Sequence, residues 1–249
     1  MAEQRVAWVT GAGSGIGRGL AQRLARDGWS VAVSARSATD LDALALETPG
    51  IHAYPLDVTD RDAVAVAVPR IEQQLGSIGL AVLNAGTYVP VAANGFSAEK
   101  FGINFNVNVQ GTANCLEAVM APMIVRRAGH IAVVSSLTGY VGLPTASAYG
   151  ATKAALITMC EALEPELEAE DVKMTVITPG FVDTPLTRKN EFPMPFLISV
   201  DDAVERIVRG LERGKFEVAF PLRMSVAIRL LAALPHWARL AVTRRMLPR

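Results

Sequence analysis

The sequence predicts an α/β protein in which helices cover both faces of a doubly wound parallel sheet of about seven strands. Short runs rich in β-branched residues alternate with longer helical stretches, as in folds that connect parallel strands through helices. The short runs are apolar almost throughout, which is typical of strands buried on both faces. The length of 249 residues and the hydrophobic content of 51% suit a single large domain.

The expected strands are the apolar runs at residues 5–10, 30–35, 51–56, 80–85, 130–136, 173–178 and 215–220. The expected helices lie between them, at residues 15–28, 38–47, 60–75, 99–127 and 148–170. The chain continues well beyond the last expected strand. We therefore expect a main domain over residues 1–221, which holds the functional site, and an amphipathic helical tail over residues 222–249.

The composition narrows the classes of function. Lys and Arg together number 24, as do Asp and Glu, so the charge gives no reason to expect a nucleic acid partner. Cys115 and Cys160 stand apart from each other and from histidine, which predicts neither a disulfide framework nor a metal site. The N-terminal segment lacks the features of a signal peptide, and no apolar run reaches the ~18 residues of a membrane span. We therefore expect a cytoplasmic protein.

A glycine-rich stretch, VTGAGSGIGRGL, follows the first expected strand and begins the first expected helix. Gly11, Gly13, Gly15 and Gly17 allow a tight turn and let a phosphate approach the backbone amides. The positive end of the following helix dipole points at the same place. This arrangement predicts a dinucleotide site, and a P-loop is disfavoured because no Gly-Lys-Ser/Thr follows.

The end of the second expected strand, VSARS, bears on the type of nicotinamide cofactor. An acidic residue there would bind the ribose hydroxyls of NAD. Ala35 occupies that position and Arg36 follows, and an arginine can pair with the additional phosphate of NADP. The alternative is a solvated arginine at a strand end. We expect NADP rather than NAD.

Tyr149 and Lys153 lie four residues apart in the stretch SAYGATKAAL, so they share one face of a helix. A nearby ammonium group favours the phenolate and lowers the pKa of a tyrosine. A shift of ~2–3 units would suit the hydroxyl for acid–base chemistry near neutral pH. The alternative is an ordinary Tyr–Lys pair on a wet surface. Ser136, however, ends a strand thirteen residues earlier, at the sheet edge where ligands of parallel sheets bind.

Taken together, these segments resemble the short-chain dehydrogenase/reductase family, in its short single-domain branch, over roughly residues 5–220. The glycine-rich stretch is similar to the family's TGxxxGxG turn, and residues 149–153 are similar to its YxxxK pair. The other matching positions are Asn84, Ala85 and Gly86 (NAG), Asn108, Ser136, and Pro179, Gly180, Val182 and Thr184 (PGxVxT). All of them occur in the family's order and at its spacing.

The resemblance implies a Rossmann-like catalytic domain that transfers hydride between NADP(H) and a carbonyl compound or secondary alcohol. Tyr149 would be the general acid or base, and Ser136 would hold the substrate oxygen. Lys153 would bind the nicotinamide ribose and keep the tyrosine acidic, and Asn108 would anchor a water that relays protons. A buried structural amide is the alternative for Asn108. The family also implies a homodimer or homotetramer.

The cofactor site implied by the resemblance extends along the whole groove. Asp57 and Val58 would contact the adenine, and Val182 and Thr184 would hold the nicotinamide carboxamide. A helix cap is an equal alternative for Asp57. The full set of implied cofactor residues is Gly11, Ser14, Gly15, Ile16, Gly17, Arg36, Asp57, Val58, Asn84, Ala85, Gly86, Tyr149, Lys153, Pro179, Gly180, Val182 and Thr184.

Two segments depart from the usual pattern. From residue 218 onward the chain has six arginines and no acid, and apolar residues recur at helical spacing on both sides of Pro235. We expect two short amphipathic helices that pack within an oligomer or on the domain, in preference to a membrane surface. Residues 185–199, with Phe192, Met194 and Phe196, would cover the substrate. They predict either a hydrophobic substrate or a mobile lid that shields the site.

Three other functions compete with this prediction. A dinucleotide sensor without catalysis would bind cofactor and not turn over, and the presence of Ser136, Tyr149 and Lys153 disfavours it. A sugar-nucleotide epimerase or dehydratase of the extended branch would need a TGxxGxxG turn and a larger substrate region. A membrane-peripheral reductase of lipid-like substrates would be anchored by the tail.

Overall fold

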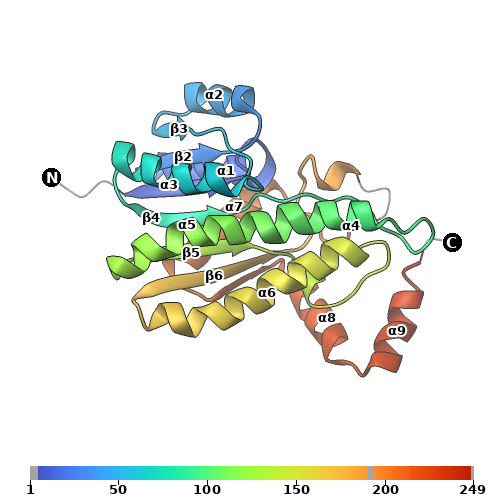
Figure 1. Cartoon of the computed structure of the whole chain (residues 1–249). Helices are drawn as coiled ribbons and strands as arrows, with labels where there is room; N and C mark the ends of the chain where they lie inside the picture. Colours follow the sequence, from blue (N-terminus) through green and yellow to red (C-terminus); the bar gives the residue numbers. More distant parts are fainter. Residues whose placement is uncertain (1–4, 190–192, 248–249) are drawn as a thin grey trace.

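The computed structural model describes residues 5–189 and 193–247 (Figure 1). Within these residues, seven strands form one parallel sheet in the order β3-β2-β1-β4-β5-β6-β7. Their bounds are β1 (Val6–Thr10), β2 (Ser30–Ser34), β3 (Ile51–Ala53), β4 (Ile78–Leu83), β5 (Gly129–Val134), β6 (Val172–Pro179) and β7 (Glu217–Phe220). The predicted fold class is confirmed.

The helices of the main domain cover both faces of the sheet. They are α1 (Gly15–Arg26), α2 (Ala38–Glu47), α3 (Arg61–Leu75), α4 (Ala98–Phe105), α5 (Gly111–Val125), α6 (Ser147–Glu168) and α7 (Val200–Glu212). A π-helical segment, η1 (Asn106–Gln110), interrupts the single helix expected over residues 99–127. α7 is absent from the expected helices, although Ser199 caps it and its buried residues recur at helical spacing.

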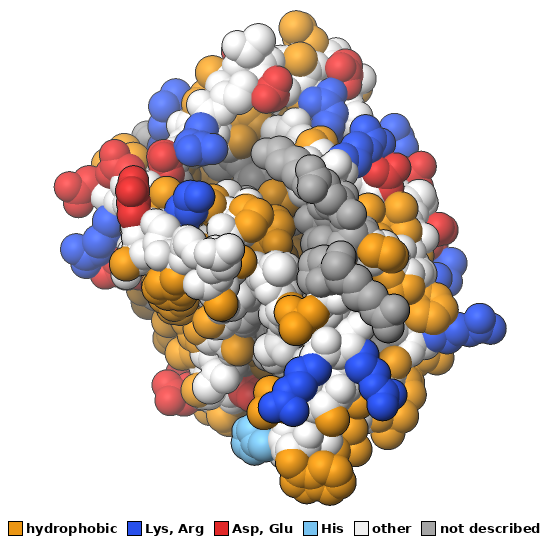
Figure 2. All heavy atoms as spheres, turned by 90° about the vertical axis from the view of Figure 1, so that its right-hand side faces the viewer, with side chains coloured by type: hydrophobic (Ala, Val, Ile, Leu, Met, Phe, Trp, Pro, Cys, Tyr) orange, Lys and Arg blue, Asp and Glu red, His pale blue; other side chains and the backbone are white. Residues whose placement is uncertain are grey.

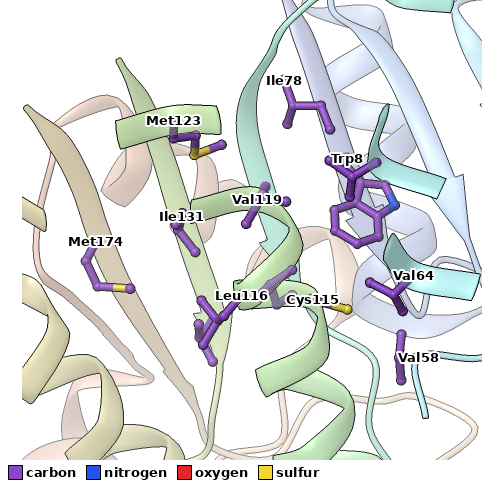
Figure 3. Packing of buried hydrophobic residues seen from close by; sticks show 14 of the residues in the cluster. Trp8, Val58, Val64, Ile78, Cys115, Leu116, Val119, Met123, Ile131 and Met174 are labelled. Atoms are coloured by element: carbon purple, nitrogen blue, oxygen red, sulfur yellow. The ribbon is translucent and has the colours of Figure 1, made fainter. Parts of the chain in front are cut away.

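The alternation of side chains in β1 explains its continuous apolar sequence. Val6 and Trp8 belong to the core cluster under α3, α5 and α6, and Ala7 and Val9 belong to the cluster under α1, α2 and α7. Figure 3 shows the Trp8 ring pointing from β1 toward residues of α3 and α5. Its indole N–H donates to Ser34 Oγ at 3.0 Å, so the ring is buried without an unsatisfied donor.

The sheet order determines where a ligand can bind. From β1 the chain proceeds through β2 and β3 on one side and then crosses to β4 on the other. Doubly wound sheets bind their ligands at such a reversal, outside the carboxyl ends of the strands. The glycine turn follows β1, Asn84 follows β4 and Ser136 follows β5, so all three lie at this edge.

The tail contains two short helices, α8 (Leu222–Ala233) and α9 (His236–Arg244), on either side of Pro235, as predicted. α8 packs on the main domain, because Met224, Ile228 and Leu231 form a buried cluster with Leu137 and Val141. Among the helices of the described residues, none combines the length and apolar character that crossing a bilayer requires.

Candidate active site

A groove of about 390 Å³ opens at the carboxyl edge of the sheet, between the glycine turn, the ends of β4, β5 and β6, and α6. The predicted site residues that line it are Gly11, Ser14, Gly15, Ile16, Arg36, Asn84, Gly86, Ser136, Tyr149, Lys153, Pro179, Gly180, Val182 and Thr184. The predicted residues outside its lining are Gly17, Asp57, Val58, Ala85 and Asn108. Pro185, Leu186 and Thr187, from the segment expected to cover the substrate, also line the groove. The lining residues that were not predicted are Thr87, Val134 and Ser135.

The glycine turn is shaped for a close approach to backbone amides. Gly11 and Gly15 have φ angles of +65° and +57°, which residues other than glycine rarely adopt. The N-cap Ser14 makes no side-chain hydrogen bond to the first turn of α1, whereas serine or aspartate side chains cap α2, α3, α4 and α7. The first amides of α1 therefore face the groove without a side-chain partner and suit a pyrophosphate.

Thr10 and Asn84 hold this turn against the end of β4. Thr10 Oγ1 accepts hydrogen bonds from the amides of Asn84 (3.0 Å) and Ala85 (3.1 Å). In return, Asn84 Nδ2 donates to the carbonyl oxygens of Thr10 (3.0 Å) and Gly11 (3.2 Å). Asn84 thus shapes the turn as well as lining the groove. Thr10 is a supporting residue whose part no local sequence pattern reveals, because its partner is 74 residues away.

Asn108 lies in the π-helical segment and is fully buried. Its side-chain oxygen accepts from Thr87 N (2.7 Å), and its amide donates to Thr87 O (3.0 Å) and to Thr152 Oγ1 (3.0 Å). Asn104 clamps Val89 in the same two-bond manner, to its N (3.1 Å) and its O (3.0 Å). Asn108 therefore has the structural role that we left open for it, and its part in a proton relay stays a prediction.

Asp57 lies close enough to Arg36, which lines the groove, for the two charges to interact. Asp57 Oδ1 accepts from the amide of Thr59 (3.0 Å) and its hydroxyl (2.8 Å), and α3 is capped by Asp60 instead. The helix-cap alternative for Asp57 is therefore wrong. The hydrogen bond from the Thr59 amide lowers the pKa of Asp57, and the charge of Arg36 adds to this. Contact of Asp57 and Val58 with an adenine stays a prediction.

Ser136, Tyr149 and Lys153 come together in the groove. Ser136 Oγ accepts hydrogen bonds from the amide of Thr138 (3.2 Å) and its hydroxyl (3.0 Å), and it donates to Pro179 O at 3.3 Å. These bonds fix the orientation of the Ser136 hydroxyl, which has one O–H to donate. Lys153 Nζ donates to Val134 O at 2.8 Å and lies 5.5 Å from the centroid of the Tyr149 ring.

The pKa values at the site differ from the expectation. Burial raises the pKa of Tyr149 to about 12, although a hydrogen bond from Ser136 opposes this rise. The expected lowering is thus not seen for the protein groups alone, where burial is the largest cause and Lys153 is not among the causes. Burial also lowers the pKa of Lys153 to about 8. At neutral pH Tyr149 therefore keeps its proton, and Lys153, whose pKa still lies above 7, stays mostly an ammonium.

The sequence is similar to those of known proteins. Residues 5–193 match the short chain dehydrogenase family. The chain belongs to that family. An uncharacterized oxidoreductase of Myxococcus xanthus is 41% identical to this dehydrogenase over 246 residues, which cover 97% of each chain.

Two solved structures resemble the dehydrogenase in fold. A short chain dehydrogenase/reductase of Burkholderia phymatum in complex with NAD has a TM-score of 0.83 and 22% identity over 92% of each chain. An alcohol dehydrogenase of Thermococcus sibiricus complexed with 5-hydroxy-NADP has a TM-score of 0.79 and 27% identity. That match covers 88% of this chain and 96% of the other. The chain is thus an oxidoreductase enzyme with a Rossmann-like fold.

The buried lysine of the dehydrogenase makes its stability depend on pH. The pKa of Lys153 is about 8 in the folded chain, below its ordinary 10.5, so the unfolded chain binds more protons between these values. Lys153 therefore lowers the free energy of unfolding at neutral pH, and this loss is recovered as the pH rises through that window. We expect urea denaturation to show that the free energy of unfolding of the wild type rises relative to that of Lys153→Met. The rise is up to about 1.4 kcal/mol per pH unit in this window. A constant difference from pH 7 to pH 10.5 would contradict the burial of the ammonium group.

Proposed function

We propose that this dehydrogenase transfers hydride between NADP(H) and a carbonyl compound or secondary alcohol, with Tyr149 as the general acid or base. The observation that supports the proposal best is that Ser136, Tyr149 and Lys153 line the same groove as the glycine turn of α1. A dinucleotide on the turn would reach the three side chains along this groove. The alternative of a sensor without catalysis gives no reason for the three side chains to meet there.

The groove fits a nicotinamide dinucleotide along its length. The uncapped amides of α1 suit the pyrophosphate, and Pro179, Gly180, Val182 and Thr184 line the same groove as Tyr149. Lys153 would bind the nicotinamide ribose, because its ammonium is held by Val134 O and still lines the groove. When bound, the cofactor supplies or accepts the hydride, and the protein supplies orientation and the proton.

The proton chemistry follows from the protein groups. With its pKa raised, Tyr149 holds its proton at neutral pH and can donate it to a carbonyl oxygen as negative charge develops there. Ser136, held by its two bonds from Thr138, can turn its hydroxyl hydrogen bond from Pro179 O to the same oxygen and so hold it in place. In the alcohol-to-carbonyl direction the phenol must first lose its proton, and the ammonium of Lys153 favours that loss.

The substrate side of the groove is formed partly by the expected lid. Pro185, Leu186 and Thr187 line the groove, and Phe196 and Leu197 are 51% and 44% exposed beyond it. Phe192 lies outside the described residues. These apolar side chains support a hydrophobic substrate, and a lid that only shields the site remains the alternative.

Arg36 supports NADP as the preferred cofactor. Its side chain is exposed, lines the groove, and follows an alanine where an acid would select NAD. The acid nearest to Gly13 of the glycine turn is Asp40, whose Oδ2 lies 3.7 Å from the position of a Cβ built on Gly13. The two solved relatives carry NAD in one case and an NADP analogue in the other. A test of the preference for NADP over NAD must therefore change Arg36.

We expect Arg36→Ala to raise the KM for NADPH by about 10–100-fold, the size of a lost charged hydrogen bond, and to leave the KM for NADH unchanged. Steady-state rates with both cofactors measure this. Arg26→Ala is the matched control, because Arg26 is exposed on α1 and lies outside the groove. A wild-type enzyme that oxidises NADH faster than NADPH would overturn the preference.

A screen of NADPH oxidation against aldehydes, ketones and 3-oxo thioesters tests the proposed reaction itself. We expect turnover with at least one carbonyl class, and the reverse reaction with the matching alcohol. Tight binding of NADPH without turnover of any of these carbonyl classes would favour the sensor instead.

A further inference from the structure

The outer side of the tail exposes large apolar side chains. On α8, Leu222, Val226 and Leu230 are 71%, 47% and 66% exposed, and they recur every four residues. On α9, Trp237 and Leu240 are 77% and 51% exposed. The opposite side of α8 is the one that packs on the main domain. We call the exposed residues Leu222, Val226, Leu230, Trp237 and Leu240 the outer face, and the core of the domain does not account for them.

Most arginines of the tail have no acidic partner in the described part of the chain. Arg229 pairs with Glu217, whereas Arg223, Arg239, Arg244 and Arg245 form no ion pair with any described residue. The chain has no acid from residue 218 onward. The helices therefore combine an exposed apolar side with unpaired positive charge, which is the pattern of helices that lie on anionic lipid.

A basic cavity continues the outer face toward the sheet edge. It has a volume of about 470 Å³ and lies between α7, β7 and α8, and Leu222 and Val226 are among its lining residues. Its charged lining residues are Arg206, Arg209, Arg213, Lys215, Arg229 and Glu217. Arg209 pairs with Glu205 and Arg229 with Glu217, whereas Arg206, Arg213 and Lys215 form no ion pair with any described residue. Three unpaired cations around a cavity beside apolar residues suit a phosphate headgroup with its acyl chains nearby.

The charge also argues against a second copy of the chain as the occupant. If the outer face lay on a twofold axis, it would meet the same face of a second copy. Here it would bring two sets of unpaired arginines into contact, which costs free energy unless anions intervene. Charge complementarity therefore favours an anionic surface over this chain itself.

We propose that the outer face docks the dehydrogenase on an anionic membrane surface. α8 follows directly from the carboxyl end of β7, so it lies at the end of the molecule where the groove opens (Figure 1). Figure 2 shows this end, with hydrophobic and basic side chains over its lower part, where α8 and α9 lie. Docking would thus bring the end of the molecule that holds the groove to the lipid.

Co-sedimentation of the full chain with vesicles tests the docking. The vesicles are phosphatidylcholine alone and an equal mixture of phosphatidylcholine and phosphatidylglycerol. We expect at least about tenfold tighter binding to the anionic vesicles, falling as salt rises. Equal binding to both vesicles, or binding to neither, would overturn the proposal. This readout does not depend on cofactor or turnover, so it stands or falls separately from the proposed reaction.

Matched variants locate the contact on the tail. Leu230→Ser with Trp237→Ser should abolish binding, whereas Leu46→Ser should retain it, because Leu46 is 88% exposed on α2. Arg244→Glu with Arg245→Glu should weaken binding at least about tenfold, and the same charge reversal at the exposed Arg26 and Arg70 should not. Circular dichroism checks that each variant folds. If both tail variants bound anionic vesicles as tightly as the wild type, the contact would lie outside the tail, and the proposal would be wrong.

Light scattering separates a membrane from a second copy. We expect Leu230→Ser with Trp237→Ser to leave the mass of the particle in solution unchanged. The opposite result would be a wild-type oligomer that the double substitution converts to a smaller particle, with no binding of the wild type to anionic vesicles. The outer face would then be an interface between copies, and the proposal would be wrong.

Discussion

Tyr149→Phe is expected to lower kcat at least about a hundredfold and to leave the Kd for NADPH unchanged. The change removes one oxygen and keeps the ring that packs against Tyr88, with centroids 5.3 Å apart. Ser136 would still hold a substrate oxygen, but no group would deliver a proton to it. The effect therefore falls on kcat. Stopped-flow or steady-state NADPH oxidation measures the rate, and fluorescence titration measures the Kd.

Tyr88→Phe is the matched control for this prediction. Tyr88 is the edge-on neighbour of Tyr149, and it does not line the groove. We expect this variant to keep the wild-type rate. If Tyr149→Phe were as active as Tyr88→Phe, the proton would come from another donor, and the assignment of Tyr149 would be removed.

The parts of the fold that sequence predicts are those with a local physical cause. β1 is buried at all five positions, and the apolar run from Val6 to Val9 that this requires is visible in sequence. Tyr149 and Lys153 share a face of α6 because helical periodicity requires it. Glycine at positions 11 and 15 reflects their positive φ angles. Each of these depends only on residues near in the chain.

The features that escape prediction depend on residues distant in the chain. The hydrogen bonds between Thr10 and Asn84 need β1 and β4 to be neighbours, which the sheet order alone decides. The raised pKa of Tyr149 follows mainly from burial in the finished groove. The π-helical segment places Asn108 against Thr87, 21 residues earlier, and no periodicity in the sequence marks it.

The glycine turn provides the second large effect, which we expect from Gly17→Ala. A Cβ on Gly17 would lie 2.5 Å from both Gly11 O and Asn84 Nδ2. Gly11 O is backbone, and Asn84 Nδ2 is held by its own bonds to the turn, so the turn itself must open. We expect the Kd for NADPH to rise at least about tenfold, because the amides that would meet the pyrophosphate move. Overpacking of this kind also lowers the free energy of unfolding by about 1–3 kcal/mol.

Gly19→Ala separates the loss of binding from the loss of stability. Gly19 is two residues further along α1, and a Cβ there would lie 2.7 Å from Val200 Cγ1, a side chain of α7 outside the groove. Urea denaturation should show both variants destabilised, and titration with NADPH should show weakened binding in Gly17→Ala alone. If the two variants lost equal affinity, general destabilisation would explain both, and the turn would have no special part in holding the dinucleotide. Unequal affinities at equal stability would instead show that the distance between α1 and the end of β4 sets the affinity for the cofactor.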